Sequence, residues 1–233
     1  MQSPTNNQAT AIAEMLAMQN ALNEMTNGKD WRAGVTSLGK PIDWQRCIYM
    51  ETAELIDSYP WKHWKSVDAQ TDMENVRVEL VDIWHFLLSL AMEKLSDEQA
   101  LQVLHDALEK VHKSALPENL SNPEQVDVHE QLMRLALLRD ARSISYIGDL
   151  GCAFFASCQA VSLQFSEMYR IYMAKNVLNK FRQDHGYKEG VYIKLWNGKE
   201  DNVVMFELME TLQEFSGDNL YKELKQAYNQ MVG

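Results

Sequence analysis

The sequence predicts an all-α fold, a multi-helix bundle, and three observations carry that prediction. Good helix formers such as Leu, Ala, Met, Glu and Gln are abundant along the chain. Only ten glycines and five prolines interrupt its 233 residues, so long helices can run without a break. Strand-like alternation is convincing only in "GVYIKLW". We find no internal repeat, and we expect a single domain over residues 1–233.

The first half of the chain is expected to form four helices with recognisable ends. Ile12 and Met15 belong to the apolar face of the first one, and "TNG" after it is a glycine C-cap signal. Asp43, Asp72 and Ser96 directly precede the next three helical patterns and are good N-cap residues. These four helices are expected over residues 8–26, 44–58, 73–94 and 97–113.

The second half continues as helices separated by stretches rich in turn residues. We interpret "LPENLSNPEQ", "DHGYKEG" and "WNGKEDN" as loops, because Gly, Pro, Asn and Asp favour turn conformations. The helices between and after them are expected over residues 124–142, 148–182, 202–215 and 218–231.

The composition argues against several classes of protein. A formal net charge of −11 repels nucleic-acid backbones and anionic membranes, so neither is an expected partner. Three cysteines without regular spacing give no disulfide framework. The first ten residues lack the features of a signal peptide, and no apolar run approaches the roughly 18 residues of a membrane span. We therefore expect a cytoplasmic enzyme or binding protein.

Two carboxylate pairs lie on consecutive expected helices in apolar surroundings. Glu51 and Glu54 belong to "METAE", and Glu79 and Asp82 belong to "VELVD". Residues three apart share a helix face, and a short connector makes the two helices antiparallel neighbours. Four carboxylates facing a core would repel one another and lose hydration, and a shared cation would remove both penalties. Oxygen ligands with no Cys and little His suit Mg²⁺ or Mn²⁺.

Two other interpretations of these residues stay open. Carboxylates three residues apart are common on solvated helix faces, although here the flanking positions are apolar. Asp82 with His85, and Glu109 with His112, resemble the carboxylate–His pairs of di-iron helical bundles. One of these motifs begins with Asp, and the upstream helix already has two carboxylates, so the pattern fits that bundle poorly.

The spacing of the carboxylates also resembles a known metal signature. Glu-x-x-Glu, 24 intervening residues and Glu-x-x-Asp is similar to the signature of the all-α nucleoside triphosphate pyrophosphatase superfamily. The surrounding sequence resembles the dimeric, all-α dUTPases over about residues 10–95 and 150–205, whereas the helical segment 96–147 carries no recognised motif. The similar stretches are "QNALNEMTNGKDW", "RCIYMETAELIDSYPWKHWK", "ENVRVELVDIWHFLLSL" and "KNVLNKFRQDHGYKEGVYIKLWNGKEDN".

This resemblance implies a homodimeric enzyme that hydrolyses dUTP, and also dUDP, between the α and β phosphates. The products are dUMP and pyrophosphate or phosphate, so the reaction limits uracil in DNA and supplies dUMP. The resemblance also implies that Glu51, Glu54, Glu79 and Asp82 hold Mg²⁺. Metal ions that neutralise phosphate oxygens let an acidic site serve an anionic substrate. Glu54 is our candidate for the base that orients or deprotonates the attacking water.

A basic block in the last of the similar stretches is expected to bind phosphate. Lys175, Asn179 and Arg182 recur at i, i+4 and i+7 and therefore share one helix face. Arg offers a planar fork of donors to phosphate oxygens, and Lys offers a point charge. Without the resemblance, such a run would be interpreted as a solvated basic face. The remaining substrate-binding candidates in this part of the chain are Tyr187, Lys188 and Asn202.

Amides and aromatic side chains are expected to recognise the base and sugar. Gln19 and Asn23 lie one turn apart on the first helix and match the family's "Q…LN" block, and each amide carries a donor and an acceptor for uracil. They are otherwise ordinary polar positions on an amphipathic helix. Trp61 is a candidate wall beside the base, and Phe86, one turn beyond Asp82, a candidate floor of the sugar site. We expect Trp64 and Trp84 to be core residues.

Two alternatives to dUTP hydrolysis follow from the same residues. A pyrophosphatase for another nucleotide, such as dCTP or a nucleotide with a damaged base, would share the metal site. The second alternative is a helical interaction module that is not an enzyme, and such a protein would release no pyrophosphate.

Overall fold

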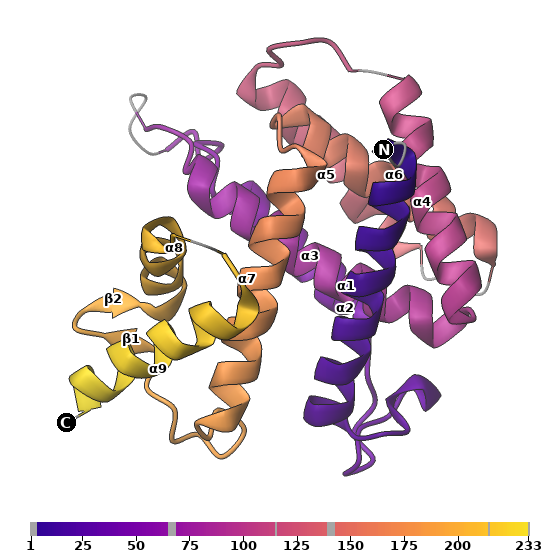
Figure 1. The fold of residues 1–233 in the computed structure, drawn as a ribbon. Helices are drawn as coiled ribbons and strands as arrows, with labels where there is room; N and C mark the ends of the chain where they lie inside the picture. The colour runs from indigo at the N-terminus through magenta and orange to yellow at the C-terminus, as the bar shows by residue number, and fades with distance from the viewer. Residues whose placement is uncertain (1–3, 65–68, 115, 139–142, 214, 233) are drawn as a thin grey trace. The chain divides into compact units, whose positions relative to one another are not determined.

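Helices make up most of the chain in the computed structural model, which describes residues 4–64, 69–114, 116–138, 143–213 and 215–232 (Figure 1). The all-α prediction is confirmed. The chain divides into two compact units, Met1–Tyr169 and Arg170–Gly233, and each is described by itself. The single domain that the sequence predicted stays a prediction.

Over its described residues, the first unit is built from six α-helices, a short 3-10 helix and the beginning of a seventh α-helix. Their bounds are α1 Pro4–Asn27, η1 Trp31–Ala33, α2 Trp44–Asp57, α3 Met73–Lys94, α4 Asp97–Lys113, α5 Asn122–Leu137, α6 Ile144–Ala160 and α7 Phe165–Asp184, the last of which continues into the second unit.

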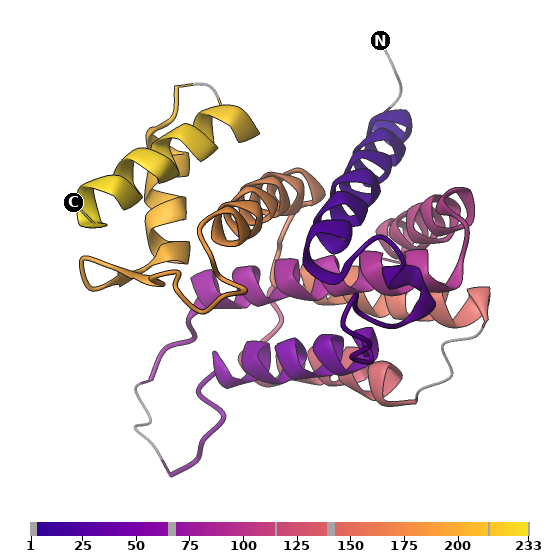
Figure 2. The same cartoon turned by 90° about the horizontal axis from the view of Figure 1, so that it is seen from below.

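Helix α3 forms the centre of the first unit, where it packs against α1, α2, α4 and α6. Its core residues are buried, most of them completely, and the ring of Trp84 stacks on Phe154 of α6 with centroids 4.9 Å apart. The prediction that Trp84 is a core residue is confirmed. Figure 2 shows α2 and α3 side by side and antiparallel, joined by the connector that follows Asp57.

The predicted N-cap residues are confirmed at the starts of the two helices that carry the carboxylates. Asp43 accepts a hydrogen bond from the backbone N–H of Arg46 at 3.0 Å, and Asp72 accepts one from Asn75 at 3.0 Å. A side-chain cap satisfies an amide that the helix itself leaves without a partner, and it typically contributes about 1 kcal/mol. The starts of α2 and α3 are therefore fixed close to where the sequence predicts them.

The prediction of one continuous helix over residues 148–182 is wrong. The pattern over 148–182 is not one helix, because α6 ends at Ala160 and α7 begins at Phe165. Ser162 adopts a left-handed conformation with φ 56°, and the N–H of Leu163 bonds back to the carbonyl of Cys158 at 2.9 Å. This is the geometry of a helix C-cap, and the apolar periodicity on either side hides it. Of the helix expected over 124–142, the described part ends at Leu137, and residues 139–142 lie outside the described residues.

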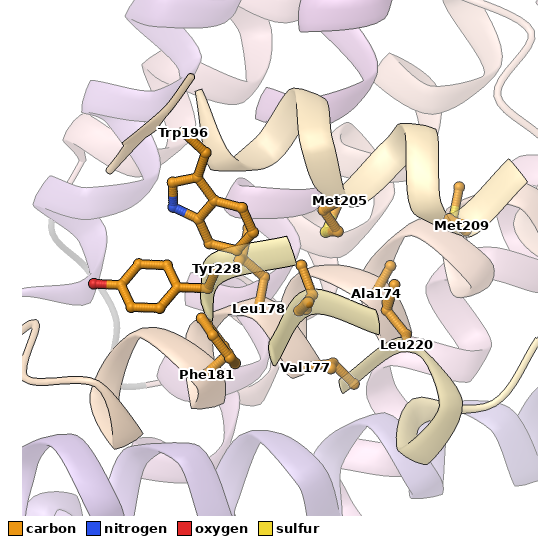
Figure 3. Close-up of a cluster of buried hydrophobic side chains, with 10 residues drawn as sticks. Ala174, Val177, Leu178, Phe181, Trp196, Met205, Met209, Leu220 and Tyr228 are labelled. Atoms are coloured by element: carbon orange, nitrogen blue, oxygen red, sulfur yellow. The ribbon is translucent and has the colours of Figure 1, made fainter. Parts of the chain in front are cut away.

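The second unit contains the rest of α7, a two-stranded hairpin and two helices around its own core. The hairpin pairs β1 Leu195–Trp196 with β2 Lys199–Glu200, and α8 Asp201–Thr211 and α9 Gly217–Val232 follow. Figure 3 shows the buried core between α7, β1, α8 and α9. The labelled side chains are Ala174, Val177, Leu178, Phe181, Trp196, Met205, Met209, Leu220 and Tyr228.

The hairpin corrects the loop that the sequence predicted over "WNGKEDN". Asn197 and Gly198 both have positive φ, 51° and 84°, which is the geometry of the tight two-residue turn that Asn-Gly favours between antiparallel strands. The alternating stretch "GVYIKLW" is strand only in its last two residues.

Among the described residues, no single helix has the length and apolar character to cross a membrane, and α6 and α7 meet that test only together, as a bent pair across their break.

Candidate active site

Three carboxylates from α2 and α3 converge in the first unit. Each of Glu51, Glu79 and Asp82 offers an oxygen, and these oxygens all lie within 4.8 Å of one another. Glu79 is buried, whereas Glu51 and Asp82 are half-buried. The local sequence explains this position, because Ile48 and Leu55 on α2 are completely buried and turn the face between them toward α3.

The electrostatics of this triad favour a cation. Burial, followed by the charges of Asp82 and Glu79, raises the pKa of Glu51 to about 8. A carboxyl group whose pKa rises in this way is one whose negative charge is opposed by its surroundings. Carboxylate oxygens without sulfur or imidazole are the ligands that Mg²⁺ and Mn²⁺ prefer, so the residues present fit a hard divalent cation.

Glu54 lies outside this triad. Its side chain is exposed, although its charge contributes to the raised pKa of Glu51. The prediction of four metal ligands therefore stays a prediction, with three of the four carboxylates brought together. In the part of the chain that the structure describes, no other group of three or more His, Cys, Asp or Glu side chains converges in this way.

The described residues do not assemble the di-iron arrangement. Nδ1 of His85 lies 2.8 Å from the carbonyl oxygen of Val81 and donates to it. His112 is exposed on α4, and Glu109 of the same helix pairs with Lys113 at 3.6 Å. Because the group of described residues that could hold a metal contains carboxylates only, the carboxylate–His pairs are not part of it.

A second polar cluster lies further along α3. Gln19 and Asn23 of α1 are buried, at 3% exposure each, and they meet Ser89, which is completely buried. The nitrogen atoms Nε2 of Gln19 and Nδ2 of Asn23 lie 3.1 and 2.9 Å from Ser89 Oγ. Nε2 of Gln19 also donates to Oδ1 of Asn23 at 3.1 Å. The two predicted amides are thus brought together, and the sequence interpretation missed the serine that joins them.

Residues of the carboxylate triad and of the amide cluster share one face of α3. Glu79, Asp82, Phe86 and Ser89 are spaced at i, i+3, i+7 and i+10, which places them within about a quarter turn of one another. Ser89 lies seven residues beyond Asp82, or about 10 Å along the helix axis. This face therefore carries carboxylates at one end and neutral hydrogen-bonding groups at the other.

Aromatic side chains accompany this face. Phe86 is half-buried and stacks on Trp44, with centroids 6.1 Å apart. Trp61 is 49% exposed and donates through Nε1 to Asp57 at 3.1 Å. The prediction that Trp64 is a core residue is wrong, since it is 63% exposed and contacts Trp61 edge-on.

In the second unit, the predicted phosphate-binding residues are tied to the start of α8. Nε and Nη2 of Arg182 each lie 2.8 Å from an oxygen of Asp201, a bidentate ion pair in which the Asp201 side chain is completely buried. Nη1 of Arg182 donates to Oδ1 of Asn179 at 3.1 Å. Nζ of Lys175 donates to Oδ1 of Asn202 at 3.1 Å. The adjacent residues Asp201 and Asn202 are thus the partners of the two predicted cations on α7.

The ion pair with Arg182 controls the charge of Asp201. Burial would raise the pKa of Asp201, but hydrogen bonds and charge from Arg182 outweigh burial, and the net pKa is lowered. The hydroxyl of Tyr192 donates to the same carboxylate at 2.8 Å. The sequence interpretation missed Asp201 and Tyr192. Their signal is faint, since Asp201 merely precedes Asn202 after an Asn-Gly turn.

The last two candidates lie in the loop after α7. Tyr187 is 47% exposed, with the Arg182 guanidinium 5.9 Å from the centre of its ring. Lys188 is exposed beside it. The loop turns at Gly186, where φ is 82° and a Cβ would lie 2.3 Å from a methyl of Val191, so only glycine fits there.

Comparison with known proteins gives one family. A family model described as dUTPase matches residues 11–187, about three quarters of the chain. The match covers both amides, all four carboxylates and the basic face of α7, and it ends before Lys188, Asp201 and Asn202. No curated protein matches the chain. With its all-α fold and its carboxylate triad, the chain belongs to the all-α dUTPase family, a family of enzymes that hydrolyse dUTP.

Proposed function

We propose that this protein is a Mg²⁺-dependent dUTP pyrophosphatase that cleaves dUTP between the α and β phosphates to give dUMP and pyrophosphate. The same site would accept dUDP and release phosphate. The observation that carries the proposal is the convergence of Glu51, Glu79 and Asp82, whose mutual repulsion a divalent cation would relieve. Mn²⁺ is the alternative ion, because it has similar ligand preferences.

In this proposal Glu51, Glu79 and Asp82 hold the metal, and Glu54 completes the set from the exposed side of α2. When bound, Mg²⁺ would neutralise phosphate charge and acidify a coordinated water. Glu54 is exposed and one turn from Glu51, so its carboxylate can orient the attacking water or take its proton.

The substrate contacts of the proposal come from both ends of the nucleotide. Gln19 and Asn23 read the uracil edge, and Phe86 and Trp61 border the base and sugar. From the family resemblance, we keep the cations of the second unit as candidates for phosphate binding. These are Lys175, Arg182 and Lys188, with Asn179, Tyr187 and Asn202 as polar neighbours.

The test is a nucleotide panel of dUTP, dUDP, dCTP and dTTP, assayed for pyrophosphate or phosphate with and without Mg²⁺. We expect dUTP and dUDP to be hydrolysed only with the metal, and dCTP and dTTP poorly. Preferred turnover of dCTP would move the assignment to another nucleotide, and metal-independent turnover would remove the carboxylate triad from the mechanism. From the family resemblance alone, we also propose that the enzyme acts as a homodimer, and from its composition we propose that it acts in the cytoplasm.

A further inference from the structure

Within the described part of the chain, the hydroxyl of Ser89 has three polar neighbours, and only one arrangement of hydrogens satisfies them. Oγ lies 2.8 Å from the carbonyl oxygen of His85, one turn earlier on α3. It also lies 3.1 and 2.9 Å from the amide groups of Gln19 and Asn23. A carbonyl oxygen can only accept, so the single hydroxyl proton of Ser89 is donated to His85.

Both amides must consequently turn their nitrogens toward Ser89. Once the hydroxyl proton is committed, the remaining lone pairs of Oγ can only accept, so the groups facing Oγ must be N–H donors. A side-chain amide has two orientations, related by a half turn, that exchange its donor and its acceptor. The backbone of α3 therefore sets the orientation of two α1 side chains through one serine hydroxyl.

We propose that Ser89 is a specificity-determining positioning residue, which selects uracil over cytosine by fixing the orientation of the Gln19 and Asn23 amides. The inference rests on the proposed function. Uracil presents an N–H at position 3 and an acceptor at position 4, whereas cytosine presents an acceptor and an amino group. An amide of fixed orientation pairs with one of these edges and opposes the other, and an amide free to turn accepts both.

The setting of Ser89 fits this role better than a simple packing role. A serine inside a helix commonly returns its hydroxyl to the carbonyl four residues back, and that bond alone needs no partner on another helix. Here the same oxygen is shared with two buried amides from α1, on the face of α3 that carries Glu79 and Asp82. The cluster thus joins the amides to the helix that holds the candidate metal ligands.

The experiment compares Ser89→Ala with a matched control, Ser157→Ala. Ser157 is also a completely buried serine on a helix of the first unit, and its hydroxyl has no hydrogen-bond partner among the described residues. We expect Ser89→Ala to lower the ratio of kcat/KM for dUTP to kcat/KM for dCTP at least about fivefold, because the amides can then turn. Ser157→Ala should leave this ratio unchanged, and Ser89→Thr, which keeps the hydroxyl, should restore it.

The outcomes separate the inference from the proposed function. A wild-type enzyme that hydrolyses dUTP with Mg²⁺, and a Ser89→Ala enzyme with an unchanged ratio, would overturn the inference and leave the function standing. A wild-type protein without dUTP turnover would overturn both. Should Ser89→Ala not fold, the side-chain amide protons of Gln19 and Asn23 in wild-type protein give a second measurement by NMR. Nuclear Overhauser contacts from the NH₂ protons of both amides to the Ser89 side chain support the fixed orientation, and the absence of such contacts contradicts it.

Discussion

Glu51, Glu79 and Asp82 bring like charges together on α2 and α3, whereas Arg182 and Asp201 bring opposite charges together on α7 and α8. The two groups respond in opposite ways. Burial and neighbouring carboxylates raise the pKa of Glu51 to about 8, while the hydrogen-bonded guanidinium overcomes burial and lowers the pKa of Asp201. A group of like charges weakens the fold until a counter-ion binds, and an opposite pair is costly only when broken.

Removing one charge should therefore have opposite effects in the two places. In the triad it should abolish function and spare the fold. In the ion pair it should damage the fold directly. Two neutral clusters, one around Ser89 and one in which the buried His129 contacts Tyr59, should respond less strongly, because no full charge is left without a partner.

The largest effect is expected for Glu79→Gln. The variant should lose at least about a hundredfold in kcat/KM at saturating Mg²⁺, since even residues that only support a metal ligand often cost 10- to 100-fold when lost. Its melting temperature without metal should equal or exceed that of the wild type, because one repelling charge is gone. Activity assays and thermal melts with EDTA measure the two effects.

Glu74→Gln is the matched control for this substitution. Glu74 is an exposed carboxylate in the first turn of the same helix. It should keep full activity. Wild-type turnover by Glu79→Gln would remove the residue from the metal site, and a marked loss of stability would mean that Glu79 supports the fold.

Arg182→Ala should destabilise the second unit by about 3–5 kcal/mol, because it leaves the buried Asp201 carboxylate without its partner. It should also lower kcat/KM, but the loss of stability must be separated from that effect. The double variant Arg182→Ala with Asp201→Asn removes both charges and should regain most of the lost stability without regaining activity. Urea unfolding measures the first effect. A loss below about 1 kcal/mol in the single variant would show that the pair contributes little.

The sequence predicts the carboxylates far better than it predicts the ion pair. Acidic residues on apolar helix faces contradict the hydrophobic pattern, so Glu51 and Glu79 stand out from the residue pattern alone. Arg182 follows the ordinary pattern of a solvated basic face, and its partner Asp201 lies 19 residues away beyond a hairpin. Long-range pairing of this kind depends on how α8 returns to α7, which no local pattern encodes.

The fold, too, has features that the local sequence predicts and features that it does not. Caps such as Asp43 and Asp72 act within three residues, so the starts of α2 and α3 are readable from the sequence. The break between α6 and α7 is not, because Ser162 takes a left-handed conformation that glycine or asparagine usually signals. Ser89 escapes prediction for a related reason: one serine in an apolar helix carries no pattern at all.

A smaller effect is expected from the neutral cluster of His129, and it depends on pH. The hydroxyl of Tyr59 donates to Gln125 at 2.9 Å and accepts from Nε2 of the buried His129 at 3.0 Å. Burial lowers the pKa of His129 from 6.5 to about 4. Unfolded protein therefore takes up a proton first as the pH falls. The stabilisation is complete above pH 6.5 and is lost toward pH 4, by up to about 3 kcal/mol.

This loss is tested by measuring the free energy of unfolding in urea between pH 7.5 and 4.5, for the wild type and for His129→Gln. Glutamine can still hydrogen-bond to Tyr59 but cannot take up the proton. Carboxylates elsewhere titrate in both proteins, so the difference between the two curves isolates His129. Parallel curves would show that the imidazole is protonated as easily in the folded chain as in the unfolded one.

The smallest effect is expected for Asn23→Ala, which removes one amide from the proposed base site. Loss of one hydrogen-bonding partner should lower kcat/KM for dUTP by a factor equivalent to about 1–3 kcal/mol and leave Mg²⁺ binding intact. Discrimination against dCTP should weaken, because the amide both pairs with uracil and opposes the reversed edge of cytosine. Rejection of dTTP should survive better, since it depends on space at C5. The measurement is kcat/KM for the three nucleotides.

Asn20→Ala supplies the control, because Asn20 lies on the same helix and bonds to Glu24 at 2.8 Å, away from Ser89. It should leave all three values unchanged. The test depends on the ratios of kcat/KM between the three nucleotides, because a general weakening of α1 would lower all three kcat/KM values together. If Asn23→Ala lowers them by one common factor, Asn23 supports the fold or the phosphates. In that case the neutral end of the α3 face does not read the base, and only its charged end belongs to the active site.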